Sequence, residues 1–277
     1  MRSGRKSLLA LLSSAGITLS LLSPRVAIAG SQTPSAQKDP AALAALAQMV
    51  AATGWNPLSL PADAVVTGVV TPVADSSSNV TLKMKGLGEF RVDTQTVAGV
   101  RSLILNIGQA ALTLPDGTSQ LLPIQDAVSI WPVDVPVFSS LALAASSPAA
   151  SVGSLGTEVV NGVSCNKVQI TAQTDPTSPL APITSQAASI VLWLDASTGL
   201  PAQIQYMRIA ADNSSAAIAH IRQFSNYHVV NGMQFAFTQQ EFMGGQLRFT
   251  LQLSSVTLNV GLTDTDFALP SAPQGGF

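Results

Sequence analysis

The residues that could do chemistry are few and widely spaced. Ser164 and Lys167 fit the S-x-x-K pattern of some serine acyl-enzymes. That chemistry needs both side chains to point into one pocket from the start of a helix. Here they lie on an alternating stretch, which predicts a strand with the two side chains on opposite faces. We therefore interpret this match as a chance occurrence.

The remaining candidate groups also predict no catalytic centre. His220 and His228 stand eight residues apart, and no acid is spaced to orient either ring. Cys165 adjoins an apolar strand and is interpreted as a small buried hydrophobe rather than a reactive thiol. Asp264 and Asp266 lack the glycine and the terminal glutamate of a calcium loop. We predict no catalytic residue, no metal ligand and no cofactor, and an enzyme is the least favoured hypothesis.

Composition excludes several classes of protein without naming an activity. The chain has 277 residues, of which 47% are hydrophobic and only 10% are charged, with a net charge of −2. High hydrophobicity with few charges excludes general disorder, and the absence of a basic excess excludes a nucleic-acid binder that depends on a basic surface. A single cysteine excludes an internal disulfide, and two histidines with it are too few for a zinc site of the Cys/His kind.

The amino terminus predicts export. Basic residues within the first six positions precede an apolar run over residues 8–22, and Ala27-Ile28-Ala29 forms a small-x-small cleavage site. We predict a cleavable signal peptide over residues 1–29, with an uncleaved anchor as the alternative. No cysteine near this site could accept a lipid. We therefore expect a soluble protein in the periplasm or outside the cell.

One helix is predicted after a flexible segment over residues 30–38. Asp39 can cap the first free amides, and proline suits the first helical position. The stretch 41–52 is alanine-rich, and Gly54 is a plausible stop. The residues expected on its apolar side are Leu43, Leu46, Met49 and Val50.

The rest of the chain predicts strands in meander order, joined by turns such as Asp116-Gly117, Asn161-Gly162 and Asn231-Gly232. About ten or eleven strands imply one large, strongly curved antiparallel sheet. We predict a single domain over residues 39–270, followed by a tail over residues 271–277. The predicted strands are 64–70, 80–85, 90–93, 100–107, 110–114, the hairpin within 159–172, 189–194, 202–210, 217–227, 233–242 and 246–258.

Two proline-containing stretches interrupt this series. Residues 131–156 could hold a short helix near 139–145 or lie over the sheet as a lid. Residues 175–187 are predicted to form an exposed excursion between strands.

The last hairpin predicts a sheet with one polar and one apolar face. In 233–258, aromatic and aliphatic residues occupy one parity, whereas Gln, Thr and Arg248 occupy the other. The strand 190–194 is apolar on both parities, so it is either covered on both sides or faces a cavity. Curvature into a half-open barrel, with the helix over its mouth, would shield the apolar face from water.

Such a barrel could keep an apolar cavity for a small ligand. The alternative is an interior filled by side chains, with no space for a ligand. The residues that we predict to line the cavity are Trp193, Tyr206, Phe235, Phe237, Phe249 and Leu251.

Three stretches carry a resemblance to a known family. They are "GTEVVNGVSCNKVQIT", "IVLWLDASTGLPAQIQYM" and the stretch from "FSNYHVVNGMQF" to "DTDFALP", together with an upstream "GLGEFRVD". The chain ends in an Asn-x-x-x-x-Asp-x-x-Phe-x-x-Pro run formed by Asn259, Asp264, Phe267 and Pro270. Over roughly Asp39 to Pro270, the sequence resembles the LolA/LolB-like family of periplasmic lipoprotein carriers.

This resemblance implies an α+β fold, mainly antiparallel: an unclosed, apolar-lined half-barrel lidded by helical segments. It implies non-covalent carriage of lipid or lipoprotein acyl chains by a protein that works as a monomer, with a membrane-associated donor or acceptor as a further possible partner. The alternative function is a secreted structural or interaction module with a filled core.

The sequence departs from the family in two places. The carrier has an Arg-Pro pair near its early strands that locks the lid, whereas Lys83-Met84-Lys85-Gly86 stands here and Arg91 is the nearest candidate. LolB-type members are lipoproteins, and this chain has no lipid-accepting cysteine. The fold is therefore expected to transfer better than the lipoprotein-sorting role.

Overall fold

The computed structural model describes residues 37–56, 60–86, 88–122, 141, 145–173, 188–210 and 213–270, without the side chains of 209–216. The chain divides into two units, residues 1–34 and 35–277, and all described residues belong to the second. The predicted signal peptide, the excursion 175–187 and the tail 271–277 lie outside the described residues. No helix in the described part is long and apolar enough to cross a membrane.

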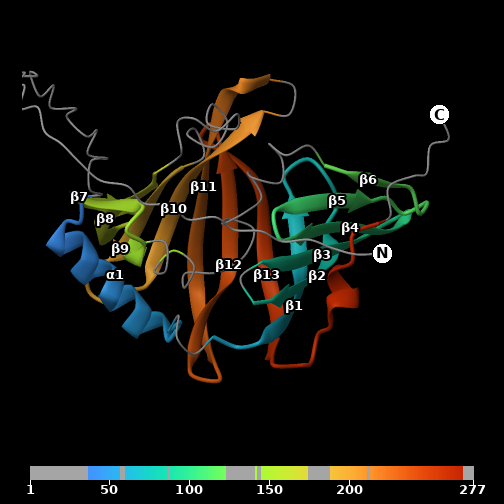
Figure 1. Ribbon diagram of the computed structural model, residues 1–277, viewed down its shortest axis with the longest axis horizontal. Helices are drawn as coiled ribbons and strands as arrows, with labels where there is room; N and C mark the ends of the chain where they lie inside the picture. The colour runs from blue at the N-terminus through green and yellow to red at the C-terminus, as the bar shows by residue number, and fades with distance from the viewer. Residues whose placement is uncertain are drawn as a thin grey trace, which may run out of the picture. The chain divides into compact units, whose positions relative to one another are not determined.

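A single antiparallel sheet of 13 strands dominates this unit (Figure 1). The strands lie in the order β6-β5-β4-β3-β2-β1-β13-β12-β11-β10-β9-β8-β7, so β6 and β7 are the edge strands and the sheet is not closed. The predicted α+β half-barrel is confirmed. The strands are β1 Asp63–Pro72, β2 Ser78–Lys85, β3 Glu89–Thr96, β4 Gly99–Asn106, β5 Gln109–Thr113, β6 Ser119–Leu121, β7 Ala150–Val160, β8 Val163–Ala172, β9 Ser189–Asp195, β10 Pro201–Ala210, β11 Asn213–Val230, β12 Met233–Met243 and β13 Gln246–Leu258.

The strand count exceeds the prediction of ten or eleven. The three-residue β6 is too short to show a periodic pattern, although it pairs with β5 across the predicted Asp116-Gly117 turn. In addition, β7 begins at Ala150, inside the stretch expected to be a lid. Elsewhere in that stretch, Leu141 and Ala145 have helical backbone and are buried in the main core, and most of residues 123–144 lie outside the described part.

The helix α1 Pro40–Thr53 has the predicted ends. The Asp39 carboxylate accepts hydrogen bonds from the amides of Ala41 and Ala42 at 2.7 and 3.2 Å. At the other end Gly54 has φ +70°, and a Cβ there would lie 2.4 Å from the carbonyl oxygen of Gly232. Glycine is therefore required twice over, by its backbone conformation and by the close approach of the β11–β12 turn.

The face that α1 buries differs from the predicted one. Leu46 and Met49 are buried as expected, but Leu43 is 38% exposed and Ala42 and Ala45 replace it in the core. These small side chains let the helix backbone approach the sheet closely. The helix packs against β7, β8 and β12 (Figure 1).

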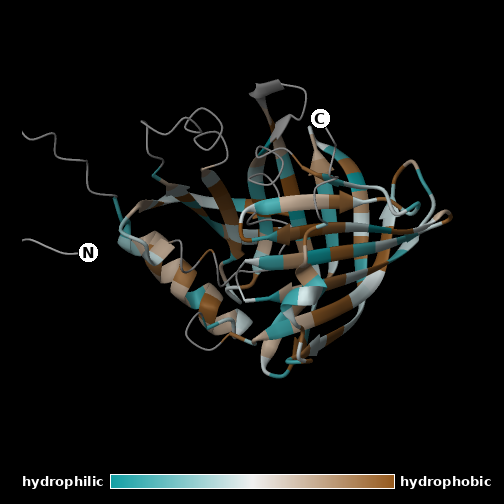
Figure 2. Cartoon of the chain, turned by 45° about the vertical axis from the view of Figure 1, so that its right-hand side comes forward, coloured by the Kyte–Doolittle hydropathy of each residue, from teal (hydrophilic) through white to brown (hydrophobic). Residues whose placement is uncertain are grey.

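The two faces of the sheet hold separate apolar clusters, and Figure 2 shows the alternation of apolar and polar residues along the strands. The main cluster lies on the inner face, which α1 covers in part, and contains Phe90, Leu105, Leu192 and Phe235. A second cluster of Val160, Cys165 and Trp193 lies apart from it. The strand 190–194 is therefore covered on both sides, which explains its apolar residues on both parities.

The chain before α1 adds a short segment to the β7 edge. Lys38 forms a parallel bridge with Val152. The Val152 amide donates to the Gln37 carbonyl, and the Asp39 amide donates to the Val152 carbonyl, each at 2.8 Å. The Lys38 ammonium also donates to the carbonyls of Ala145 and Ser147. The first half of this edge strand is therefore occupied by the chain itself.

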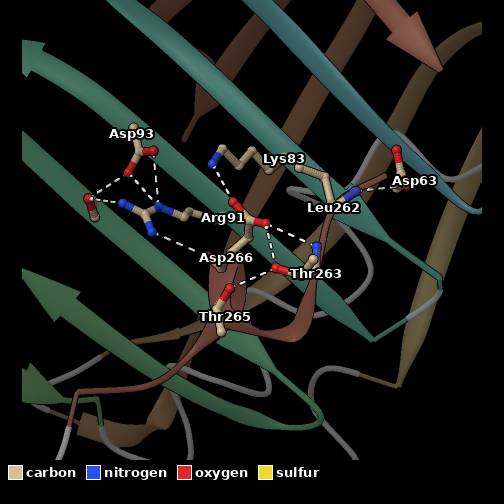
Figure 3. Close-up of polar contacts among 9 residues, drawn as sticks. Asp63, Lys83, Arg91, Asp93, Leu262, Thr263, Thr265 and Asp266 are labelled. Carbon is tan, nitrogen blue, oxygen red and sulfur yellow. Dashed lines mark hydrogen bonds and ion pairs between the residues drawn. The ribbon is translucent and has the colours of Figure 1, made fainter. Parts of the chain in front are cut away.

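The carboxy-terminal segment is fastened to the outer face of the sheet (Figure 3). The buried Asp63 carboxylate accepts hydrogen bonds from three successive amides, those of Val260, Gly261 and Leu262, at 2.6–3.1 Å. The 3-10 helix η1 Asp264–Phe267 follows and packs on β3 and β4, with Phe267 fully buried. This segment contains the Asn-Asp-Phe-Pro run of the sequence, which attaches the end of the chain to the outer face of the sheet.

Two cations of the sheet hold η1 in place (Figure 3). The Lys83 ammonium lies 2.7 Å from the Asp266 carboxylate, and Arg91 donates to the Asp266 carbonyl at 3.2 Å while its Nε pairs with Asp93 at 2.8 Å. Their strand neighbours Leu82 and Val92 point the other way, into the interior. Arg91, the nearest sequence candidate for a lid-locking arginine, therefore fastens the carboxy-terminal segment.

We predict that Gly54→Ala lowers the free energy of unfolding by more than the ~1–2 kcal/mol expected from a left-handed backbone alone. The matched control is Gly117→Ala, because Gly117 has φ +84° but no atom within 4 Å of its virtual Cβ. Urea denaturation of both variants measures the difference. Equal losses would show that the close approach to Gly232 is unimportant.

We predict that Asp63→Ala lowers the free energy of unfolding by about 1–3 kcal/mol, because three amides lose their acceptor. Asp75→Ala is the control, since Asp75 is exposed and, among the described residues, accepts hydrogen bonds only from neighbouring Ser76. Thermal and urea unfolding should leave that control within about 0.5 kcal/mol of the parent. A similar loss in both variants would contradict a fastening role for Asp63.

Candidate functional site

A cavity of about 470 Å³ lies on the inner face, open to solvent on one side. This volume falls within the ~300–1,000 Å³ that is usual for small-molecule sites. One wall comes from β1 to β4 and the other from β10 to β13. The sheet must curve to bring these walls together, because β4 and β10 are separated by six strands in the sheet order.

The cavity and the helix occupy opposite ends of the long strands. The cavity is lined by the end of β12 and the start of β13, whereas Gly54 at the end of α1 meets the turn between β11 and β12. No residue of α1 lines the cavity. The helix packs on the half-barrel as predicted, but it covers the region near β7, β8 and β12 rather than this cavity.

Aliphatic side chains are the largest group in the cavity wall. They stand on the inner parity of five neighbouring strands, β4, β3, β2, β1 and β13. The wall is completed by Phe249 and Met243. The aliphatic residues are Val70, Val80, Leu82, Val92, Leu103 and Leu251.

A buried polar cluster lies at one side of this apolar wall. Glu241, only 3% exposed, accepts a hydrogen bond from the Tyr206 hydroxyl at 2.5 Å and lies 2.7 Å from Nδ1 of His220, both at Oε1. Its Oε2 accepts from Nε of Arg222 at 2.8 Å. The register explains the cluster, because Arg222 lies opposite Glu241 and His220 lies opposite Tyr206.

The cluster keeps Glu241 ionised. Burial on its own would raise the pKa of this carboxyl group, but the His220 hydrogen bond, the Arg222 charge and the Tyr206 hydroxyl outweigh it. The pKa of Glu241 is lowered from 4.5 to about 2. The carboxylate and the Arg222 guanidinium thus balance each other's charge inside the barrel.

A β-bulge turns another arginine toward the cavity. In the β12–β13 ladder Glu241 pairs with Phe249 and Phe242 with Leu247, so Arg248 is the extra residue between them. A bulge re-aims the side chains beside it, and Arg248 lines the cavity together with Phe249. The simple alternation of the sequence placed Arg248 on the wet face. The residue is exposed, but the bulge brings it beside the cavity, which an unbroken ladder did not predict.

The described residues that line this cavity combine apolar side chains with charged ones. Among the described residues that line the cavity, Thr94 carries the only hydroxyl and no thiol or lysine is present. His220 has an orienting acid in Glu241, contrary to the sequence-based expectation, because strand pairing rather than spacing brings them together. Aliphatic walls beside arginines suit an elongated molecule with an apolar part and a polar end.

The structure places the six predicted lining residues in different surroundings. Phe249 and Leu251 line the cavity. Tyr206 is buried one layer behind it, and its hydroxyl reaches Glu241. Phe235 lies toward the other end of the strands, where its ring packs on Trp55 at 5.1 Å in a small separate pocket.

The other two predicted lining residues stand apart from the cavity. Phe237 is partly buried against the main core, and its ring contacts that of His228 at 4.5 Å. Trp193 belongs to the second cluster, where the ammonium of Lys167 lies 4.7 Å from its ring centroid. Trp193 points away from the cavity because it follows Leu192, which faces the main core.

Residues that sequence reasoning missed form the polar part of the site, namely Arg101, Arg208, Arg222, Glu241 and Arg248. A signal for one of them was available. Glu241 has the same parity as Phe235 and Phe237, so an apolar face carries a charge. A buried charge needs a partner, and that requirement pointed to a polar cluster inside the barrel.

Comparison with known proteins gives a fold but no close relative. No known family profile matches the sequence, and no curated protein sequence matches it significantly. A domain from Vibrio parahaemolyticus assigned to outer membrane lipoprotein sorting superposes with a TM-score of 0.54 at 17% identity, covering 82% of this chain and 96% of that one.

Two further structures agree. A LolA superfamily protein from Nitrosomonas europaea superposes with a TM-score of 0.51 at 13% identity, over 82% of this chain and 97% of that one. The chain has a LolA-like fold. A DUF1329 family protein from Desulfovibrio piger is similar to it as well, with a TM-score of 0.56, 12% identity and coverage of 82% and 97%. The resemblance drawn from the sequence is confirmed at the level of the LolA-like fold.

We predict that the stability of this LolA-like barrel decreases as pH falls from about 4.5 toward 2, in part through Glu241. Its pKa is lowered in the folded state, so its contribution is present above the ordinary value of 4.5 and is lost as the carboxylate is protonated. Urea denaturation at a series of pH values measures this dependence. Glu241→Gln should be less stable at neutral pH and should lose less on acidification.

Glu158→Gln is the control for this experiment, because Glu158 pairs with Lys167 in an exposed position. Some acid sensitivity should remain in every variant, since the pKa of Asp266 is also lowered to about 2 by its hydrogen bond with Lys83. An unchanged acid profile in Glu241→Gln would contradict the coupling of the buried cluster to folding.

Proposed function

We propose that this protein is an exported, non-catalytic carrier that binds the acyl chain of a lipid or lipoprotein in the cavity of its half-barrel. The observation that carries this proposal is the open cavity of about 470 Å³, with aliphatic side chains from five adjacent strands along its wall. A hydrocarbon chain bound along this wall removes apolar surface from water. Each Å² of apolar surface buried in this way contributes ~25 cal/mol of favourable free energy.

The comparisons support this proposal through the fold. One protein with the same fold is assigned to outer membrane lipoprotein sorting and another belongs to the LolA superfamily. The sequence adds a predicted signal peptide over residues 1–29 and no cysteine to accept a lipid, so we place the mature protein in the periplasm or outside the cell. A membrane-associated donor or acceptor protein would then deliver or receive the ligand.

Within this proposal Phe249 and Leu251 contact the ligand directly. Tyr206 acts from behind the wall by holding Glu241. Phe235, Phe237 and Trp193 contribute packing that keeps the sheet curved around the cavity.

We predict that Leu103→Trp, which fills the cavity from β4, weakens binding of a fluorescent fatty acid at least tenfold. The control is Val100→Trp, since Val100 is 45% exposed on the opposite parity of the same strand. Fluorescence titration measures the binding, and circular dichroism checks the fold of each variant. Native mass spectrometry of protein isolated from the periplasm should show bound lipid.

Two outcomes would contradict the proposal. One is a parent protein that takes up no acyl probe and carries no lipid when isolated. The other is equal binding by Leu103→Trp and Val100→Trp, which would place the acyl chain outside this cavity.

A further inference from the structure

The arginines of the chain are concentrated at the cavity. After residue 30 the sequence has five arginines, and four of them (Arg101, Arg208, Arg222 and Arg248) line the cavity. The four lysines of the same region line none of it. The chain after residue 30 thus places four of its five guanidinium groups around one apolar cavity.

These arginines come from both walls. Arg101 stands on β4, on the same parity as Leu103, and Arg208 stands at the end of β10, with its guanidinium 5.8 Å from the centroid of the Tyr206 ring. Arg222 lies on β11 and its guanidinium is 6.0 Å from the Phe249 ring. Arg248 comes from the bulge at the start of β13. They surround the end of the cavity where β10 and β12 finish and β11 and β13 begin.

Among the described residues that line the cavity, Glu241 is the only carboxylate. Glu241 is engaged by Arg222, His220 and Tyr206, so it neutralises the innermost arginine. Arg101 and Arg248 form no ion pair with any described residue, and both are exposed at the mouth. The outer part of the site therefore has an excess of positive charge beside an aliphatic wall.

We propose that the cavity selects amphiphiles with an anionic headgroup, of the phosphate or carboxylate class, which Arg101 and Arg248 bind at the mouth while the chain lies along the aliphatic wall. This inference rests on the proposed function and adds the headgroup class to it. Guanidinium groups bind phosphate and carboxylate with paired hydrogen bonds, which an ammonium group does not reproduce. An uncharged headgroup would leave the arginines without this gain.

The test compares probes that share a chain and differ in the headgroup. Dodecyl phosphate, dodecyl maltoside and inorganic phosphate are titrated into the full-length mature protein by calorimetry, with each detergent kept monomeric. We expect dodecyl phosphate to bind about five- to tenfold more tightly than dodecyl maltoside, because contacts with partly exposed charges are modest. The preference should shrink as salt is raised, and inorganic phosphate should bind far more weakly than dodecyl phosphate.

Variants assign the preference to residues. Arg101→Gln and Arg248→Gln should each reduce the preference for dodecyl phosphate. The double variant should abolish this preference without weakening the binding of dodecyl maltoside. Retained maltoside binding also shows that the variants fold. Lys167→Gln removes one positive charge from the side of the sheet that carries Trp193, and it should keep the preference in full.

The other possible results separate failure of the anionic selectivity from failure of the carrier proposal. Equal binding of the two detergents, or a preference that survives in the double variant or falls equally in Lys167→Gln, overturns the anionic selectivity and leaves the carrier proposal standing. Inorganic phosphate that binds as tightly as dodecyl phosphate makes this a small-anion site, which overturns the inference. Failure of both detergents to bind overturns the proposed function itself.

Discussion

The structure depends on one constraint: a sheet that does not close must still shield its inner apolar face from water. The edge strands β6 and β7 do not pair with each other, and curvature brings β1–β4 to face β10–β13. The helix α1 covers only the region near β7, β8 and β12. The cavity is what remains where neither curvature nor the helix fills the interior, so the site follows from the architecture rather than from a special motif.

Within that interior, the partners of Glu241 stabilise its negative charge beside an apolar surface. A lone carboxylate there would be costly, and the partners on β10 and β11 make it acceptable. The same pairing fixes the register of three adjacent strands next to the cavity. On the opposite face, Asp63, Lys83 and Arg91 do comparable work for the carboxy-terminal segment. Ionised groups therefore join distant parts of a chain with few charges.

Local signals in the sequence predicted the ends of α1 and several turns, but they missed the short β6 and the start of β7. Asp39 and Gly54 marked the ends of α1 because capping depends on nearby backbone. Asn161 and Asn231 marked turns because each adopts a positive φ before a glycine. The site was harder to predict because it depends on cross-strand register. Glu241 meets His220 only through pairing, and Arg248 faces inward only because of a bulge. Neither feature has a local pattern, and aromatic content alone misplaced Trp193.

The residues ahead of α1 affect whether the β7 edge can pair with a strand from another molecule. An open sheet edge offers unpaired amides and carbonyls that a strand of a neighbouring copy can capture, which is a common route to fibrous aggregates. Because Gln37 and Asp39 already bond to Val152, the chain caps the start of its own β7 border. The opposite edge strand, β6, is only three residues long and offers an incoming strand few backbone amides and carbonyls for pairing. A sheet that does not close into a barrel can thus keep an open cavity while limiting strand pairing with other molecules at its two edges.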